Sequence, residues 1–288
     1  MSTCLGIYIG NNVVKYAKVN KEKNKFNIEA CGVKFYDTKL GETIQQIIEE
    51  TSSARLPISM NVETDKYQKF DVFAMLSKSD MKKAIDIEFE MYCNENGKLP
   101  EEYEKKYILM ENREKPEQIS ALHISVEKSE ITKKNSLVAG QKVSALFPQR
   151  VIISNLVGNI SKKEIAIINI EETTTVTVIS NGNIYVSEEI EEGMGEILDK
   201  INKKENSMSK AYEICKNTTI YTQEAQAIQD ENEYLEEIMP SLYRIIVGAQ
   251  KVIDQAISNV SEIYITRLGA VVNNIDFCFQ EYMVNTKF

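Results

Sequence analysis

The sequence lacks a surplus of positive charge and long apolar runs. Its 288 residues include 34 lysines and arginines against 43 aspartates and glutamates, which gives a formal net charge of −9 at pH 7. Nucleic-acid binding depends on a basic surface that displaces phosphate counterions, so we expect no nucleic-acid partner. The chain has no basic segment followed by an apolar run at its N-terminus, and no apolar stretch of about 18 residues. These absences predict a cytoplasmic protein without a signal peptide and without direct membrane insertion.

Cysteine and histidine are also sparse. The five cysteines are odd in number and widely spaced, and none forms a CxxC pair: Cys4, Cys31, Cys93, Cys215 and Cys278. This spacing favours reduced thiols over a disulfide framework or a metal site. The single histidine, His123, lies in an apolar segment without serine, cysteine or aspartate at a motif spacing, and we interpret it as structural. We therefore predict no catalytic residue and no metal ligand.

The clearest positive feature is an internal repeat. Residues 4–36 read as three strands, LGIYIG, VVKYAKV and FNIEACGVKFY, with a turn at Asn11 and Asn12 after the first. Residues 165–190 repeat the plan as IAIINI, TTVTVIS and NIYVSEEI, with the hairpin signal Asn181-Gly182. A helix with an apolar stripe follows each set (Ile44, Ile47 and Ile48; Met194, Ile197, Leu198 and Ile201). Duplicated halves predict two like domains that face each other across a cleft, where ligands commonly bind.

A segment between the repeats has no counterpart in the second half. Its pattern predicts, in order, a helix from Ser79, a polar loop-like piece over 94–116, a strand over 119–126, a helix over 127–138 and a strand over 142–147. This αβαβ element would be a small inserted subdomain.

The predicted domain limits follow from these two observations. Domain I would span 1–158, with its core in 1–70 and 148–158 and the inserted subdomain in 71–147. Domain II would span 159–288. Its pattern predicts helices over 209–216, 231–258 (with Pro240 inside) and 275–283, and a strand at EIYIT. The closing helix lacks a lysine and arginine face, so we expect it to pack onto its own domain.

This order of motifs resembles the actin-like (ribonuclease H-like) ATPase fold, and within it the PilM family of type IV pilus assembly proteins. LGIYIGNNVVKYAKV lies where the family has its first phosphate loop, and IINIEETTTVTVISNGNIYV where it has the second. EIYITRLGAVV lies where the family has its adenosine loop. SKSDMKKAIDIEFEMY is similar to the start of the extra 1C-type subdomain that PilM and FtsA share. The resemblance covers the whole chain and implies an α/β, two-domain actin-like fold with duplicated halves and an inserted FtsA/PilM-type 1C subdomain.

The loops depart from the family pattern. Tyr8 replaces the magnesium-side aspartate of the first loop, and strand alternation places it on the face shared with Gly6 and Gly10. In the second loop Asn169 replaces the aspartate and Glu171 the close-approach glycine.

Arg267 and Leu268 replace two glycines of the adenosine loop. No carboxylate remains at the motif positions that position water, so we predict that the chain is not an enzyme.

Eight residues of the three loops could still hold a nucleotide: Gly10, Asn11, Asn12, Thr173, Thr174, Gly193, Gly195 and Gly269. Two tight hairpins and a helix start require the same residue types, so a degenerate nucleotide site and purely structural turns both stay open. We expect no cofactor, with ATP and magnesium as the less favoured alternative.

The resemblance implies a non-catalytic scaffold of a type IV pilus, secretion or competence platform at the inner membrane. Its partner would be the cytoplasmic N-terminal segment of a PilN-like bitopic membrane protein. That segment would bind in a region bounded by 64–89 and 119–125 and hold the scaffold at the inner face of the membrane; other platform or motor ATPase components are further candidate partners. Two alternatives stay open: a working actin-like ATPase, and an FtsA-like filament-forming protein.

Overall fold

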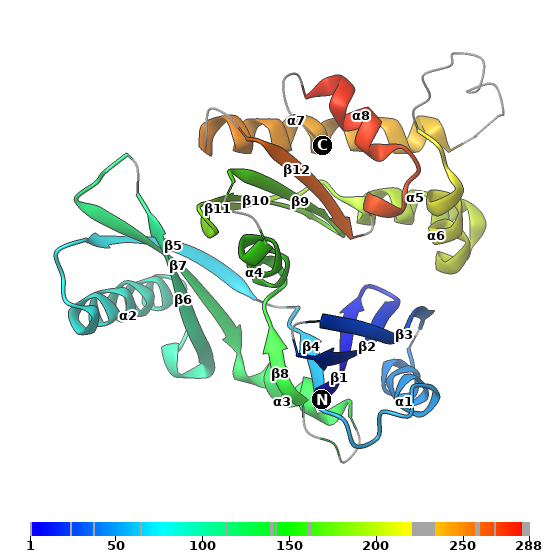
Figure 1. Cartoon of the computed structure of the whole chain (residues 1–288), viewed down its shortest axis with the longest axis horizontal. Coiled ribbons are helices and arrows are strands. Elements are labelled where there is room, and N and C mark those ends of the chain that lie inside the picture. Colours follow the sequence, from blue (N-terminus) through cyan, green and yellow to red (C-terminus); the bar gives the residue numbers. More distant parts are fainter. Residues whose placement is uncertain are drawn as a thin grey trace. The chain divides into compact units, whose positions relative to one another are not determined.

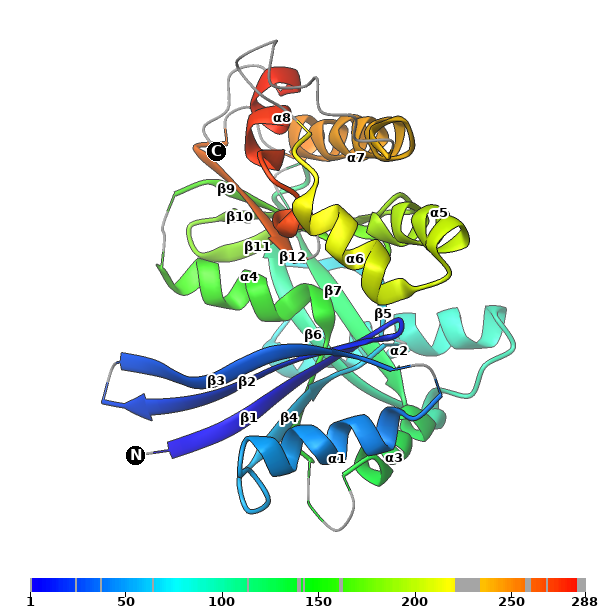
Figure 2. The same cartoon turned by 90° about the vertical axis from the view of Figure 1, so that its right-hand side faces the viewer.

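The computed structural model forms two compact units, Met1–Val151 (unit 1) and Ile152–Phe288 (unit 2) (Figures 1 and 2). It describes residues 2–23, 25–36, 38–63, 65–112, 114–138, 141, 143–160, 163–220, 234–256, 260–267 and 269–283. The units divide within helix α4 (Gln149–Ile160), earlier than the predicted limit at 158. The domain limits stay a prediction.

Unit 1 contains a five-stranded sheet in the order β3-β2-β1-β4-β8 among the described strands. The strands are β1 (Ser2–Gly10), β2 (Val13–Glu22), β3 (Lys25–Phe35), β4 (Ile58–Asn61) and β8 (Val143–Phe147). Helix α1 (Leu40–Glu50) covers one face because its stripe Ile44, Ile47 and Ile48 is buried against the sheet. Leu5, Ile7 and Ile9 alternate with half-exposed or exposed residues along β1, so they point to that covered face.

The insertion forms a second sheet in unit 1, in the order β5-β7-β6. It consists of β5 (Lys66–Phe73), β6 (Tyr103–Glu111) and β7 (Gln118–Glu127), with helix α2 (Lys78–Glu95) and a 3-10 turn η1 (Pro100–Glu102) between β5 and β6. Helix α2 packs on one face through Met81 and Ile85, which contact Val72 and Ala121. Helix α3 (Lys128–Ser136) then leads back to β8.

Three details of the insertion differ from the sequence prediction. The loop predicted for 94–116 contains β6, which pairs along its whole length with β7. The strand β5 was not predicted, and it begins before the predicted start of the insertion at 71. The strand β8, predicted as part of the insertion, pairs with β4 in the first sheet.

Helix α2 also begins before its predicted start at Ser79: it runs from Lys78, and Ser77 accepts the capping hydrogen bond from Asp80 N. Polar and apolar residues alternate too weakly in β6 to predict a strand from the sequence alone. The strand forms because it pairs with β7, which lies beyond a turn.

Unit 2 repeats the plan with a four-stranded sheet in the order β11-β10-β9-β12. Its strands are β9 (Ile165–Ile170), β10 (Thr174–Ser180), β11 (Asn183–Ile190) and β12 (Glu262–Arg267). Its helices are α5 (Met194–Glu205), α6 (Met208–Asn217), α7 (Leu235–Ala256) and α8 (Ile275–Tyr282), with a 3-10 turn η3 (Gly269–Val271) after β12. Pro240 lies inside α7, and 231–233 of the predicted long helix lie outside the described residues. Helix α8 packs in the core of its unit through Ile275, Cys278 and Phe279, as predicted.

The two hairpins share an irregularity that establishes how they correspond. In unit 1 the pairing of β2 with β3 shifts between Lys18 and Val19, and in unit 2 the pairing of β10 with β11 shifts between Val178 and Ile179. A β-bulge is a specific local feature of a strand pair and not a general property of hairpins. Its recurrence at matching places makes Val19 equivalent to Ile179 and confirms the duplication.

Candidate functional site

The first predicted phosphate loop is a two-residue turn between β1 and β2. Asn12 has a φ of +56°, which an asparagine tolerates in a hairpin turn, and its carbonyl accepts a hydrogen bond from Tyr36 N at 3.0 Å. The carbonyl of Gly10 accepts a hydrogen bond from Tyr36 Oη at 2.8 Å. The carbonyls of Gly10 and Asn12 therefore both accept hydrogen bonds from Tyr36, the residue that follows β3.

Tyr8 lies beside this turn, on the face that alternation predicts. A Cβ added to Gly10 would lie 3.4 Å from Tyr8 Cε1 and 3.2 Å from Val13 Cγ1. The Tyr8 hydroxyl donates a hydrogen bond to Gln149 Oε1 at 3.3 Å. An aromatic ring hydrogen-bonded to the first residue of α4 thus stands where the predicted first loop would need a magnesium-orienting carboxylate.

The second predicted loop packs directly on the start of α5. Met194 N donates a hydrogen bond to Glu171 O at 2.6 Å, and a Cβ on Gly193 would lie 2.2 Å from Glu172 O. A Cβ on Gly195 would lie 3.2 Å from Glu172 Cα. A helix N-terminus can bind an anion through its unpaired N–H groups, but here the first N–H is bonded to the loop itself.

The side chains of this loop are acidic or internally engaged. Glu171 is buried, and its Oε1 lies 3.8 Å from Nη1 of Arg267, which has a φ of +72°. Thr173 donates a hydrogen bond to Glu189 Oε1 at 3.0 Å. Thr174 is fully buried and pairs with Ile170, so it shares the face of the sheet that α5 and α7 cover.

The third predicted loop has one remaining glycine in a packing role. A Cβ on Gly269 would lie 2.6 Å from Ile170 Cδ1. Leu268 lies outside the described residues. Only a residue without a side chain fits between η3 and β9 at this place.

The second loop does not fit a magnesium–triphosphate group. Such a group needs free backbone donors and a carboxylate held for the metal, whereas Glu171 N and Met194 N are hydrogen-bonded within the chain and the Glu171 carboxylate lies against Arg267. In the part of the chain that the structure describes, no three histidine, cysteine, aspartate or glutamate side chains are grouped as metal ligands would be.

The inserted sheet contains the second candidate site, the predicted peptide-binding region. Of its predicted bounds, Thr64 lies outside the described residues. The described part, 65–89 and 119–125, comprises β5, most of α2 and most of β7. In the described strand order β5 is an edge strand, and Phe73 at its end is 63% exposed. An edge strand leaves backbone N–H and C=O groups that an extended peptide can pair with.

A polar cluster fixes the start of β5 to α4. Asp65 Oδ2 accepts hydrogen bonds from the Tyr67 hydroxyl and from Gln149 N, the latter at 3.0 Å. Tyr67 Oη accepts one from Arg150 N at 3.3 Å, and the Arg150 guanidinium lies 4.2 Å from the centre of the Tyr67 ring. Burial raises the pKa of Asp65, although the hydrogen bonds from Tyr67 and Gln149 oppose the shift, and burial beside Asp65 raises the pKa of Tyr67. The carboxylate thus caps the first turn of α4.

A second cluster holds the segment just before Asp65. Lys134, which is 2% exposed, binds Glu63 Oε1 at 2.5 Å, and Glu63 N donates a hydrogen bond to Glu130 Oε1 at 2.6 Å. Both clusters join residues far apart in the sequence, so no local pattern could predict them. Together they fix the connection between the two sheets of unit 1.

His123 lies in the middle of β7, between the sheet and α2. It is 1% exposed and stacks on Phe89 at 4.3 Å, and neither ring nitrogen has a hydrogen-bond partner among the described residues. Burial lowers its pKa to about 4; the charge of Lys105 adds to the shift, and that of Asp86 opposes it. The buried, stacked position of His123 agrees with the prediction that this histidine has a structural role.

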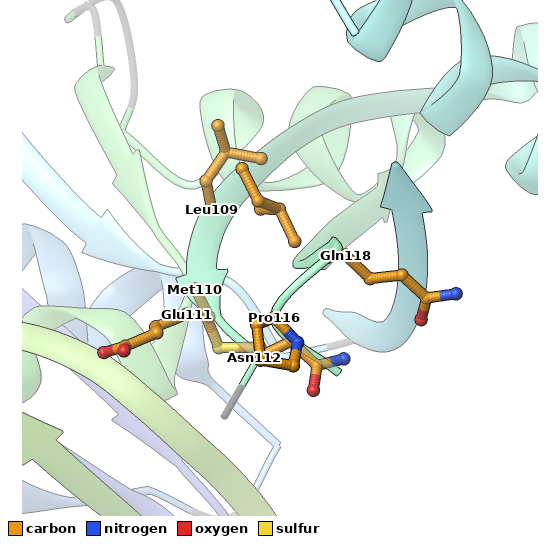
Figure 3. A pocket seen from close by; sticks show the side chains of 7 residues that line it. Leu109, Met110, Glu111, Asn112, Pro116 and Gln118 are labelled. Atoms are coloured by element: carbon orange, nitrogen blue, oxygen red, sulfur yellow. The ribbon is translucent and has the colours of Figure 1, made fainter. Parts of the chain in front are cut away.

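The end of the β6–β7 hairpin encloses a concavity of about 520 Å³. Its lining residues are Leu109, Met110, Glu111, Asn112, Pro116, Gln118 and Ile119, of which Figure 3 labels all but Ile119. The sequence did not predict this concavity, because the segment that forms β6 was expected to be a loop.

Comparisons with known proteins identify relatives by structure alone. No family model matches the sequence, and no curated protein matches it. The chain is similar to a solved structure described as the PilM-PilN type IV pilus biogenesis complex, with a TM-score of 0.71 at 13% identity over 99% of this chain and 87% of that chain. It is also similar to the ethanolamine utilization protein EutJ from Carboxydothermus hydrogenoformans, with a TM-score of 0.56 at 10% identity over 100% and 84% of the two chains.

The chain has an actin-like fold. The two similarities confirm the predicted fold class, an α/β fold of two domains. The likeness to the PilM chain is structural, since no match of sequences accompanies it.

Proposed function

We propose that this chain is a non-catalytic, actin-like scaffold of a type IV pilus, or related secretion, assembly platform. The observation that carries the proposal is the fit over 99% of the chain to a structure of the PilM-PilN complex. The partner would be the cytoplasmic N-terminal segment of a PilN-like membrane protein, and the scaffold would lie at the inner face of the membrane through that partner. Among the described residues, no helix is long and apolar enough to cross a membrane.

The inserted sheet supports a peptide-binding role. Strand β5 is an edge strand in the described order, and its start is fixed by the bonds of Asp65 and Tyr67 to α4. A rigid edge lowers the cost of ordering a bound peptide, because the edge itself need not change. Main-chain hydrogen bonds would hold the peptide, and the exposed side chain of Phe73 would contact it.

The loops support the non-catalytic part of the proposal. The N–H that begins α5 is bonded to Glu171 O, and the Glu171 carboxylate lies against Arg267. A triphosphate would have to displace both interactions without a second carboxylate to hold its metal.

The test is a binding titration of the purified chain. The probe is a synthetic peptide of the cytoplasmic N-terminal segment of a single-span membrane protein encoded beside this chain, followed by calorimetry. We expect saturable one-to-one binding that Phe73→Asp weakens about tenfold, since the substitution places a charge where an apolar contact is made.

Met91→Asp is the matched control, because Met91 is 52% exposed on α2 and does not belong to β5. Equal loss of affinity in both variants would contradict the placement on β5. No binding by the unmodified chain would contradict the proposed partner.

A further inference from the structure

The contact between helix α2 and the inserted sheet has two unlike halves. Toward the start of α2, Met81 and Ile85 pack in an apolar cluster with the sheet. Toward its end, Phe89 stacks on His123 of β7, with the ring centres 4.3 Å apart, and the imidazole is 1% exposed. All four residues belong to the insertion of unit 1, so one small subdomain contains both halves of the contact.

The end of α2 covers polar atoms without hydrogen bonds. Neither ring nitrogen of His123 has a hydrogen-bond partner among the described residues, and neither does the buried Oε1 of Gln68. Gln68 pairs directly with His123 across β5 and β7, so both side chains point to the face that α2 covers. A neutral imidazole has one donor and one acceptor, and leaving such groups unpaired in the interior opposes the favourable apolar contact. The end of α2 is therefore held less firmly than its start.

The charges near His123 disfavour a proton on its ring. Lys105 Nζ lies 5.2 Å from the centre of the Phe89 ring, which stacks on the imidazole. Asp86 of α2 favours an imidazolium, but its Oδ1 is paired with Lys105 Nζ at 2.8 Å. Burial and the charge of Lys105 lower the pKa of His123 to about 4, and the charge of Asp86 opposes the shift. The other charged or titratable side chains that strand register and helix burial place toward this face are Lys66, Tyr103, Tyr107, Glu127 and Cys93.

Local unfolding of the end of α2 would remove this conflict. A helix end can unwind while the rest of a protein stays folded. Unwinding would give His123 and Gln68 water as a hydrogen-bond partner, and the hydrated imidazole would take up a proton near its ordinary pKa of 6.5. Because the closed contact excludes that proton, each pH unit below about 6.5 shifts the equilibrium about tenfold toward the open form, until the closed ring is itself protonated.

We propose that the end of α2, residues 86–95, is an acid-sensitive lid on the inserted sheet, and that His123 is the residue that opens it. Opening uncovers an aromatic face of the sheet, where the rings of His123 and Phe70 lie 5.6 Å apart. Phe70 lies on β5, but the lid acts on the face of this strand and not on its edge. The inference therefore goes beyond the proposed function.

The test measures opening through Cys93, which lies on α2 and is 0% exposed. The purified full chain is treated with dithiodipyridine, which reacts with thiols in acid as well as at neutral pH, at several values from about pH 7 to 4. Modification of each cysteine is followed by mass spectrometry. Cys215 and Cys278 are buried in the core of unit 2 and report the opening of that unit in the same sample.

We expect Cys93 to react faster than Cys215 at every pH, with a ratio of rates that rises about tenfold for each pH unit below about 6.5. In His123→Phe the ratio should be lower and should change little with pH, because phenylalanine keeps the stacking on Phe89 without a titrating nitrogen. Gln68→Leu is the matched control for hydration alone, since it should lower the ratio and leave its pH dependence unchanged.

Hydrogen exchange of the unmodified chain is a second measurement, which does not depend on the folding of a variant. Relative to the amides of β9, those over 88–95 should exchange faster as the pH falls. The amides over 82–85 should keep their rate relative to β9, because the apolar cluster holds that half of the helix.

Three results would overturn the proposal. A constant ratio of the Cys93 and Cys215 rates across the pH range would show that α2 opens only when the whole chain unfolds. An unchanged pH dependence in His123→Phe would assign the titration to another group. Equal exchange of the two halves of α2 at every pH would show that the helix opens as one unit. All three are measured without a bound peptide, so they are independent of the titration at Phe73.

Discussion

At the scale of single residues, two of the glycines predicted for a nucleotide site, Gly193 and Gly269, are needed for packing within unit 2. Gly193 allows the turn after β9 to contact the start of α5, and Gly269 allows η3 to contact Ile170. A phosphate-binding role would require space in front of these glycines, whereas the space is filled by the chain's own backbone and side chains.

Replacing Gly193 tests this interpretation. In Gly193→Ala the new Cβ would lie 2.2 Å from Glu172 O, so a backbone shift must follow. We expect the variant to lose about 3 kcal/mol of unfolding free energy, measured by urea denaturation. Gly41→Ala is the control, since nothing lies within 4 Å of its added Cβ, and in helix α1 alanine should be neutral or stabilising by up to about 1 kcal/mol. A Gly193→Ala variant of unchanged stability would contradict the packing role.

Tyr67 supports a second prediction at this scale. In Tyr67→Phe the lost hydroxyl removes one of the two donors to Asp65 Oδ2, leaving Gln149 N, and removes the acceptor of the Arg150 N hydrogen bond. We expect a loss of about 2 kcal/mol, because both partners are removed from water. Tyr282→Phe, at a tyrosine that is 48% exposed, should change stability by less than about 0.5 kcal/mol. Equal effects of the two substitutions would show that the polar cluster does not stabilise the start of β5.

At the scale of secondary-structure elements, patterns of local spacing were predictable and long-range pairing was not. The stripe of α1 and the two hairpins follow from residues three, four or two apart, and the structure confirms them. Strands β5 and β6 are stabilised by pairing with β7 and by α2, and their own sequences mix lysine, tyrosine and acidic residues with apolar ones.

The candidate site follows the same rule. The departures at Tyr8 and Glu171 could be read from the motif, whereas the Glu171–Arg267 pair and the Asp65 cap needed the fold.

The packing of α2 on β7 predicts a pH dependence. The folded-state pKa of His123 is about 4, below the ordinary value of 6.5, because burial disfavours the charged ring. As pH falls from about 6.5 to 4, the unfolded chain takes up a proton that the folded chain does not, so stability is lost over this window. Over this window His123 lowers the free energy of unfolding by about 3 kcal/mol.

His123→Phe isolates this contribution. The chain has one histidine, so in the difference between the two proteins the contributions of carboxyl groups largely cancel. We expect the stability of the variant, from chemical denaturation at several pH values, to fall less than that of the unmodified chain between pH 6.5 and 4. Parallel curves would contradict the lowered pKa.

At the scale of the whole molecule, the two repeats share the same strand pairing, but equivalent positions in the two sheets have different environments. The equivalent positions of Cys4 and Ile165, and of Tyr8 and Asn169, differ in size and burial although the strand pairing is the same. An actin-like fold supports enzymes and binding proteins alike, so the activity depends on the loops and surfaces and not on the sheets.

The fold therefore allows ATP binding, and the loops argue against it. We predict that millimolar Mg-ATP leaves the thermal unfolding of the purified chain unchanged. A ligand at 100 times its dissociation constant would add about 2.7 kcal/mol, which at this chain length is a melting shift of several degrees. Mg-ADP and ATP without magnesium serve as controls, since a specific nucleotide site would give different melting shifts with the three ligands. A clear shift with Mg-ATP that Gly10→Val abolishes would instead establish a nucleotide-dependent scaffold or ATPase, because the added side chain would crowd Val13 and Tyr8 in the first loop.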